Sequence, residues 1–340
     1  GNRARLGVPP PTQDQDVIVD FHSHFFSRTF FDTLAAASPL PGTPDERTAH
    51  VLEATGLRLP DADPVEHWAT WQAELDRYGV EHLVTFASVP EEADDVARAV
   101  AASGGRASAL CVVDPTKDGA AARVDRLLGE LGFRGVLLFP ALHHFDPSGT
   151  AADEVFRVVA AHHALATVHT GLLAIALRDR FGLPRGYDLA HADPLRLIPA
   201  ADRHPDAHFV LPHFGGGFLR EALMAGAQCQ NVCVDTSSSN SWMRTNPGRI
   251  TLVEVFERCL EVFGGERILF GTDSSVFPRG WRHDLLTQQR EALGATGADG
   301  ATLRAVFGGN AARLLGLGAA DAAPTSSRDQ LGTASSTRGS

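Results

Sequence analysis

Short apolar segments alternate with amphipathic segments along most of this chain, and this alternation limits the fold more than any other feature. The apolar segments are rich in Val, Ile, Leu and Phe, as expected for strands that are buried on both faces. Eight such strands are predicted, at residues 17–24, 81–88, 106–115, 133–142, 164–171, 207–217, 231–239 and 267–275. Parallel strands need long crossover connections, so the alternation predicts a parallel sheet that is covered by helices.

The amphipathic segments supply the crossover helices. They lie at residues 64–80, 91–103, 119–131, 151–163, 193–205, 218–227, 250–264 and 285–293, with a last helical segment at 308–317. Eight strand–helix units in roughly 300 residues fit a (β/α)₈ TIM barrel. A doubly wound open sheet is the alternative fold, but no G-x-G-x-x-G pattern follows the first strand.

Three stretches fall outside the alternation. Residues 1–16 are predicted to be an N-terminal extension, and residues 318–340 are predicted to be a disordered tail because they lack apolar periodicity. Residues 25–62 contain many prolines and little periodicity, so we expect a long loop inserted between the first strand and its helix. The barrel itself is predicted to be a single domain over residues 17–317.

Charge and composition exclude some classes of partner. The formal net charge of −11 argues against nucleic acid or an anionic membrane. No apolar run approaches the roughly 20 residues that span a bilayer, and residues 1–16 show no secretory signal. The four cysteines form no C-x-x-C pair, so we expect a reduced, cytoplasmic protein with a small-molecule substrate.

The first strand ends in two histidines that are one residue apart. In the stretch "VIVDFHSHFF", residues 17–26, alternation places His22 and His24 on the same face of the strand. Two imidazoles on one face make half of a metal site. A pair of ordinary polar residues in a loop is the structural alternative, so the rest of the chain must decide.

Other polar residues lie at the ends of later strands. His169 ends the fifth strand, His213 the sixth, Asp235 the seventh and Asp273 the eighth. Each alone can be a buried core histidine or a helix-capping aspartate, but the carboxyl ends of barrel strands form the active site. Three imidazoles and a carboxylate suit a divalent metal such as Zn²⁺, and a further histidine can move protons.

The order of these motifs resembles the amidohydrolase superfamily. The segments "DFHSH", "VHTG", "VLPHFGGG", "LFGTDSS" and "FGGNAARLLGL" are similar to the amidohydrolase-related (family 2) branch, which includes aminocarboxymuconate-semialdehyde decarboxylase. The resemblance covers residues 17–317. As an ordered set the motifs are specific, whereas any one of them is weak.

The resemblance implies a role for each of these residues. His22, His24, His169 and Asp273 are expected to bind one divalent metal, and His213 is expected to be the catalytic histidine. Asp273 is also expected to accept a proton. Other branches bridge two metals through a lysine on the fourth strand, but that strand reads "GVLLFPAL" and the only lysine is Lys117. A mononuclear site is therefore expected, and the resemblance alone leads us to expect a homodimer.

Two reaction classes use the same ligands. The preferred prediction is a hydrolase that activates a metal-bound water against an amide, ester or lactone carbonyl, with Zn²⁺ as the favoured metal and Mn²⁺ as the alternative. The second is a non-oxidative decarboxylase of an aromatic or unsaturated acid. A third hypothesis is a non-catalytic, metal-stabilised barrel, which would not require His213.

Four further residues are candidates for substrate binding. Arg28 and Arg220 can pair with a substrate carboxylate, since arginine matches the geometry of that group. Phe26 and Trp242 can form an apolar wall. The structural alternatives are solvated arginines and aromatic side chains that only fill the core.

Overall fold

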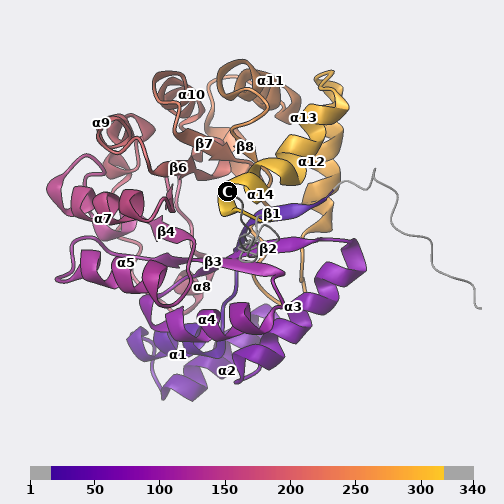
Figure 1. Ribbon diagram of the computed structural model, residues 1–340. Helices are drawn as coiled ribbons and strands as arrows, with labels where there is room; N and C mark the ends of the chain where they lie inside the picture. The colour runs from indigo at the N-terminus through magenta and orange to yellow at the C-terminus, as the bar shows by residue number, and fades with distance from the viewer. Residues whose placement is uncertain (1–16, 318–340) are drawn as a thin grey trace, which may run out of the picture.

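The strands close into a parallel barrel in the computed structural model, which describes residues 17–317. They pair in chain order as β1 Val19–His24, β2 His82–Ala87, β3 Ala107–Val112, β4 Gly135–Leu138, β5 Leu165–Val168, β6 His208–Leu211, β7 Val232–Asp235 and β8 Ile268–Leu269. In Figure 1 these strands form the central ring and the helices surround it. The predicted (β/α)₈ fold is confirmed, and the two predicted terminal segments, 1–16 and 318–340, lie outside the described residues.

Backbone hydrogen bonds between β1 and the segment after β8 close the ring. The Asp273 amide donates to the carbonyl of His22, and the His24 amide donates to the carbonyl of Ser274, each at 2.8 Å. Strand β8 itself is only two residues long, so these bonds continue the pairing between β1 and the chain that follows β8. They also place Asp273 directly beside the two histidines of β1.

Strand β1 contains one residue more than the facing part of β2. Asp20 lies opposite Leu83, but Ser23 lies opposite Thr85, so three steps along β1 match two steps along β2. An extra residue of this kind is a β-bulge, which re-aims the side chains that follow it.

The bulge decides what the barrel encloses. Val19 and Phe21 pack inside the barrel with inward residues of the other strands, among them Phe86. Strict alternation would then turn His22 and His24 outward toward the helices. With the extra residue the His22 ring instead lies 4.6 Å from the ring of Phe86, inside the mouth of the barrel.

Helices cover the outside of the ring as predicted. The main ones are α3 Pro64–Tyr78, α4 Ala93–Ala102, α5 Ala120–Gly129, α7 Thr150–Ala161, α9 Ile198–Arg203, α10 Leu219–Gln228, α11 Leu252–Phe263 and α12 His283–Ala295. The shorter ones are α6 Pro140–His143, α8 Ala176–Arg180, α13 Gly300–Arg304 and α14 Asn310–Leu315. Within residues 17–317 no helix has the length and apolarity to cross a membrane.

The prediction of a loop over residues 25–62 is wrong in part, because this insertion contains two helices, α1 Arg28–Ala37 and α2 Pro44–Thr55. Helix α2 begins with a capping box, in which Thr43 and Glu46 bond each other's backbone amides, and Pro44 sits at its first position. The many prolines of the insertion predict a loop, whereas Pro44 marks a helix start.

The insertion packs over the carboxyl end of the barrel. Phe30 and Phe31 of α1 form a small apolar core with Leu177 of α8 and with Phe181. The Ser38 hydroxyl donates to the carbonyl of Phe181 at 2.5 Å. The insertion and the segment after β5 therefore form one cap beside the mouth that holds the histidines.

Candidate metal centre and active site

Three of the four predicted ligands meet where the barrel closes. Nε2 of His24 lies 3.3 Å from Oδ1 of Asp273, and Nε2 of His22 lies 3.9 Å from the same oxygen. Burial raises the pKa of Asp273, but His24, His213 and His22 together outweigh it and hold that pKa well below its ordinary range. Metal–ligand bonds of about 2.1 Å place neighbouring donor atoms roughly 3–3.5 Å apart, so this spacing fits one divalent ion.

The outer nitrogen of each β1 histidine is already bound. Nδ1 of His22 lies 2.8 Å from Oδ2 of Asp235, and Nδ1 of His24 lies 2.7 Å from the hydroxyl of Ser88. Metal-binding histidines commonly donate their second N–H to such groups, which fixes the tautomer and the ring orientation. In both rings Nε2 is therefore the nitrogen left for a metal.

His169 approaches the group from β5. Its ring centroid lies 5.3 Å from that of His213, and its buried Nδ1 has no hydrogen-bond partner among residues 17–317. A buried polar nitrogen without a partner is costly, and a bound metal ion would satisfy it. The unpartnered Nδ1 therefore supports a bound metal. The contact of His169 with the other proposed ligands is indirect, because it runs through the ring of His213.

His213 is held by a short chain of hydrogen bonds. Its Nδ1 lies 2.8 Å from the hydroxyl of Ser237, and that hydroxyl donates to Oδ1 of Asp235. A hydroxyl has one proton, so Nδ1 of His213 must donate and Nε2 must be the acceptor, an assignment made from the hydrogen-bond network. The His213 ring centroid lies 4.9 Å from that of His22, beside the proposed ligands.

Asp235 connects the two halves of this arrangement. It is fully buried and accepts bonds from Nδ1 of His22, the amides of His213 and Ser237, and the Ser237 hydroxyl. Burial raises its pKa, but His22 outweighs that effect and the pKa falls to about 2. The sequence placed Asp235 at a strand end without a role. Its inward position on β7 was the signal that could have assigned one.

Two predicted catalytic residues adopt an unusual backbone conformation. His213 and Asp273 have φ angles of 59° and 57°, and Phe214 has 54°. Residues other than glycine rarely adopt this left-handed region, and those that do cluster at functional sites. The turn also packs tightly, since a Cβ on Gly171 would lie 2.2 Å from the carbonyl oxygen of Gly216. Close backbone contact thus fixes the β5 and β6 ends relative to each other.

Burial favours the neutral form of three of the four histidines at this site. It lowers the pKa of His24 and His213, and it lowers that of His169 well below its ordinary value. His22 is the exception, because the charge of Asp235 raises its pKa by more than burial lowers it. Neutral imidazole is the form that binds metals and accepts protons.

Phe26 and Arg28 follow β1 and make different contacts. The Phe26 ring stacks on the His24 ring at 5.1 Å, so it can form an apolar wall beside the metal ligands. The Arg28 guanidinium donates to the carbonyl of Pro60 at 3.0 Å, within the insertion. Arg28 is thus engaged in holding the cap.

Arg220 and Trp242 are not brought to the histidines. The Arg220 side chain is 84% exposed and pairs with Glu221 at 2.6 Å. Trp242 is buried in the outer core, with its ring 6.3 Å from that of Phe214. Neither contact involves the histidine group.

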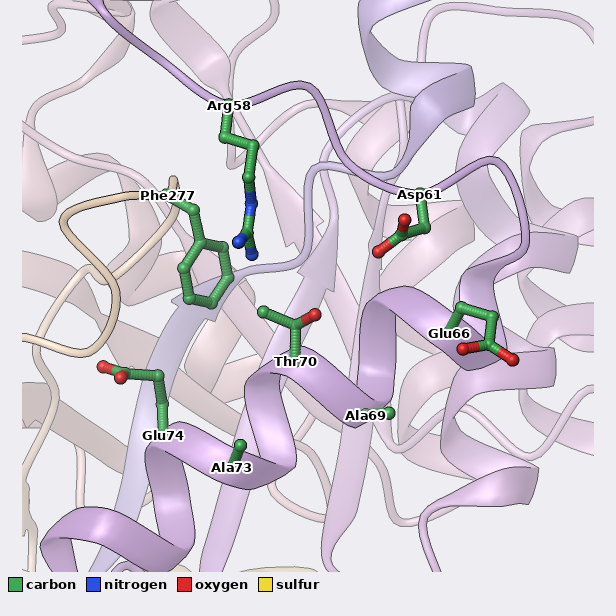
Figure 2. A pocket seen from close by; sticks show the side chains of 8 residues that line it. All are labelled: Arg58, Asp61, Glu66, Ala69, Thr70, Ala73, Glu74 and Phe277. Atoms are coloured by element: carbon green, nitrogen blue, oxygen red, sulfur yellow. The ribbon is translucent and has the colours of Figure 1, made fainter.

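A surface groove of about 490 Å³ lies over α3, away from the predicted ligands. Figure 2 shows Arg58 beside the ring of Phe277, with Glu74 below them on the helix. The guanidinium carbon lies 4.9 Å from the centroid of that ring. The eight lining residues include no histidine, so this groove is distinct from the candidate metal centre.

We expect the free energy of unfolding to depend on pH because of Glu92, which lies in the 3₁₀ turn Pro90–Glu92 after β2. Burial raises its pKa from 4.5 to about 7, against hydrogen bonds from Ser27 and Ser88 that lower it. The folded chain then keeps this proton up to about pH 7, whereas the unfolded chain releases it near pH 4.5. This group's contribution to the free energy of unfolding is therefore complete below pH 4.5 and is lost, by about 3 kcal/mol, as the pH rises through 7.

Comparison with Glu92→Gln isolates this effect. Urea unfolding of both metal-free proteins should show the wild type losing about 3 kcal/mol relative to the variant between pH 4.5 and about pH 8. Other titrating groups cancel in the difference. The same stability gap at both pH values would mean that Glu92 titrates normally.

A family model described as Amidohydrolase matches residues 19–317. The chain belongs to the amidohydrolase family. The match includes all of the residues proposed above to bind metal or move protons. This amidohydrolase is therefore an enzyme of that superfamily, which removes the main reason for considering a non-catalytic barrel.

Solved structures share this fold at low sequence identity. A 5-carboxyvanillate decarboxylase from Novosphingobium aromaticivorans, complexed with manganese, is 18% identical, with a TM-score of 0.60, 90% of this chain and 97% of that chain covered. A probable 2-pyrone-4,6-dicarboxylic acid hydrolase from Acinetobacter baumannii is 14% identical (TM-score 0.56; 88% and 99% covered). An amidohydrolase from Burkholderia multivorans with bound zinc is 16% identical (TM-score 0.56; 88% and 99% covered). No curated protein compared with this amidohydrolase matches its sequence.

Proposed function

We propose that this amidohydrolase is a metal-dependent hydrolase that acts on an ester, amide or lactone carbonyl. One observation carries the proposal. Nε2 of His213 is an unprotonated acceptor beside His22, because Nδ1 of His213 donates to Ser237. A hydrolase needs such a base to take a proton from water.

Four residues are proposed to hold one divalent ion: His22, His24, His169 and Asp273. Three imidazole donors and a carboxylate favour Zn²⁺, with Mn²⁺ as the alternative, and similar folds hold either metal. When bound, such an ion acts as a Lewis acid that polarises a carbonyl and makes a water molecule more acidic.

The chain's own residues would then manage the protons. Nε2 of His213 takes a proton from water as the water oxygen bonds to the carbonyl carbon. The same nitrogen returns that proton to the leaving alcohol or amine as the carbon–heteroatom bond breaks. The buried, ionised Asp235 stabilises the intervening imidazolium through Ser237.

Oδ2 of Asp273 is proposed to accept a hydrogen bond from the attacking water. Its contacts with His22 and His24 use Oδ1, and its side chain is 36% exposed. No hydrogen bond to Oδ2 is present among residues 17–317. We propose that Asp273 binds the metal through Oδ1 and that Oδ2 orients the attacking water.

Non-oxidative decarboxylation is the second candidate. The likeness to 5-carboxyvanillate decarboxylase favours it, since that enzyme shares the barrel. Decarboxylation requires a proton to be delivered to carbon as carbon dioxide leaves. His213 would have to be protonated on Nε2 for this task, whereas its hydrogen bonds leave that nitrogen as an acceptor.

Isotope labelling separates the two reactions. The metal-loaded enzyme would be screened against lactones, aryl esters, anilides and hydroxybenzoic acids. Hydrolysis in ¹⁸O-labelled water puts one ¹⁸O atom into the acid product. Decarboxylation incorporates no ¹⁸O and, in D₂O, leaves deuterium on the carbon that lost carbon dioxide. We expect ¹⁸O incorporation, and turnover of the benzoic acids alone with deuterated products would overturn the hydrolase proposal.

A further inference from the structure

Glu92 is a fully buried carboxylate that the proposed mechanism does not use. Glutamate is rarely buried completely unless it is paired. No arginine, lysine or histidine forms an ion pair with Glu92 in the part of the chain that the structure describes. Its hydrogen-bond donors are instead two backbone amides, those of Ser27 and Ser88.

One of these amides belongs to the residue that orients His24. The Ser88 amide donates to Oε2 of Glu92 at 2.7 Å, and the Ser88 hydroxyl lies 2.7 Å from Nδ1 of His24. That hydroxyl also lies 3.4 Å from the carbonyl of Phe86, to which it can only donate. It therefore accepts from Nδ1 of His24, which leaves Nε2 of His24 unprotonated and directed toward Asp273.

The other amide belongs to the chain that follows His24. Ser27 comes three residues after His24 and is the residue before helix α1, which forms part of the cap. Its amide donates to Oε1 of Glu92. One carboxylate thus ties the chain that leaves β1 to the chain that leaves β2, beside the residue that orients His24.

We propose that Glu92 is a positioning residue for the metal centre, which holds His24 in its metal-binding orientation through Ser88. The inference rests on the proposed metal-dependent function of the same site. Partners one step removed from a metal typically change metal affinity by 10–100-fold when they are lost. Glutamine at position 92 keeps the size of the side chain, but its NH₂ group would face an amide that needs an acceptor.

The test measures Zn²⁺ affinity by competition with a chromophoric chelator at about pH 8. We expect Glu92→Gln and Ser88→Ala each to weaken Zn²⁺ binding by about 10–100-fold. If Glu92 acts through Ser88, the double variant should bind no more weakly than the weaker single variant. The visible absorption of the Co²⁺-loaded protein should change in both single variants, because it reports the ligand geometry directly.

Asp95→Asn is the matched control. The Asp95 carboxylate accepts a hydrogen bond from Thr29 at 2.6 Å, so it also ties α4 to α1, but it does not contact Ser88. It should leave Zn²⁺ affinity and the Co²⁺ spectrum at wild-type values. Wild-type affinity in Glu92→Gln, or effects of Glu92→Gln and Ser88→Ala that multiply, would overturn the proposal. A wild type that binds no metal would instead overturn the proposed function, and Ser88→Ala tests the contact to His24 even if Glu92→Gln does not fold.

Discussion

Replacing His22 and His24 together by alanine is expected to abolish stoichiometric metal binding. Both rings have Nδ1 bound and Nε2 directed toward Asp273, so the double variant removes two of the four proposed ligands. Metal analysis of the purified wild type should give about one Zn²⁺ or Mn²⁺ per chain. The variant should retain less than about a tenth of that, since each ligand contributes to one shared ion.

His162→Ala/His163→Ala is the control for this experiment. It also removes two histidines, but His162 pairs with Asp125 at 2.8 Å on the outside of the barrel. This control should keep the wild-type metal content and fold. A well-folded wild type that takes up no metal on reconstitution would contradict the proposed centre.

His213→Asn is expected to separate metal binding from turnover. The proposal makes His213 a base and not a ligand, so metal content should stay at the wild-type level while kcat/KM falls by about 10²–10⁴-fold. Asparagine is the suitable replacement, because it tolerates the left-handed backbone of this position (φ 59°) better than most residues. Turnover would be followed with a substrate identified in the isotope screen.

The alternative assignment gives a different result. Ligand atoms of His22, His213 and Asp235 also lie within 4.8 Å of one another, so a metal bound there would use His213 directly. In that case His213→Asn would lose metal and turnover together. Ser237→Ala adds a second comparison: it should keep the metal and lower turnover, because that hydroxyl fixes the proton position on His213 and contacts none of the proposed ligands directly.

The fold could be predicted because its signal is repeated along the chain. Apolar strands and amphipathic helices alternate throughout, and each unit supports the same architecture. Boundaries were less accurate where backbone conformation decides them. The predicted strand 207–217 ends at Leu211 as β6, because Pro212 offers no N–H and the next residues turn in the left-handed region. The capping box of α2 was a readable signal that the many prolines of the insertion obscured.

The sequence could predict which strand ends carry the proposed ligands, but it says little about the side chains that support them. His22, His24 and Asp273 lie at strand ends, where the rules for barrels place functional groups. Asp235 and Glu92 matter through the atoms they contact across the barrel mouth, and those contacts join residues far apart in sequence. Arg28 and Arg220 each have a partner elsewhere that no local pattern reveals, and their role in substrate binding stays a prediction.

The extra residue in β1 makes this site depend on how the strand pairs as well as on residue type. If the same residues formed a regular strand with Val19 and Phe21 facing inward, both histidines would face the surrounding helices. A distant relative that preserves the H-x-H letters therefore preserves the metal site only if the pair falls on inward positions of its strand. For the same reason, a histidine pair grafted onto a regular barrel strand would have to replace two inward residues before it could bind metal at the mouth.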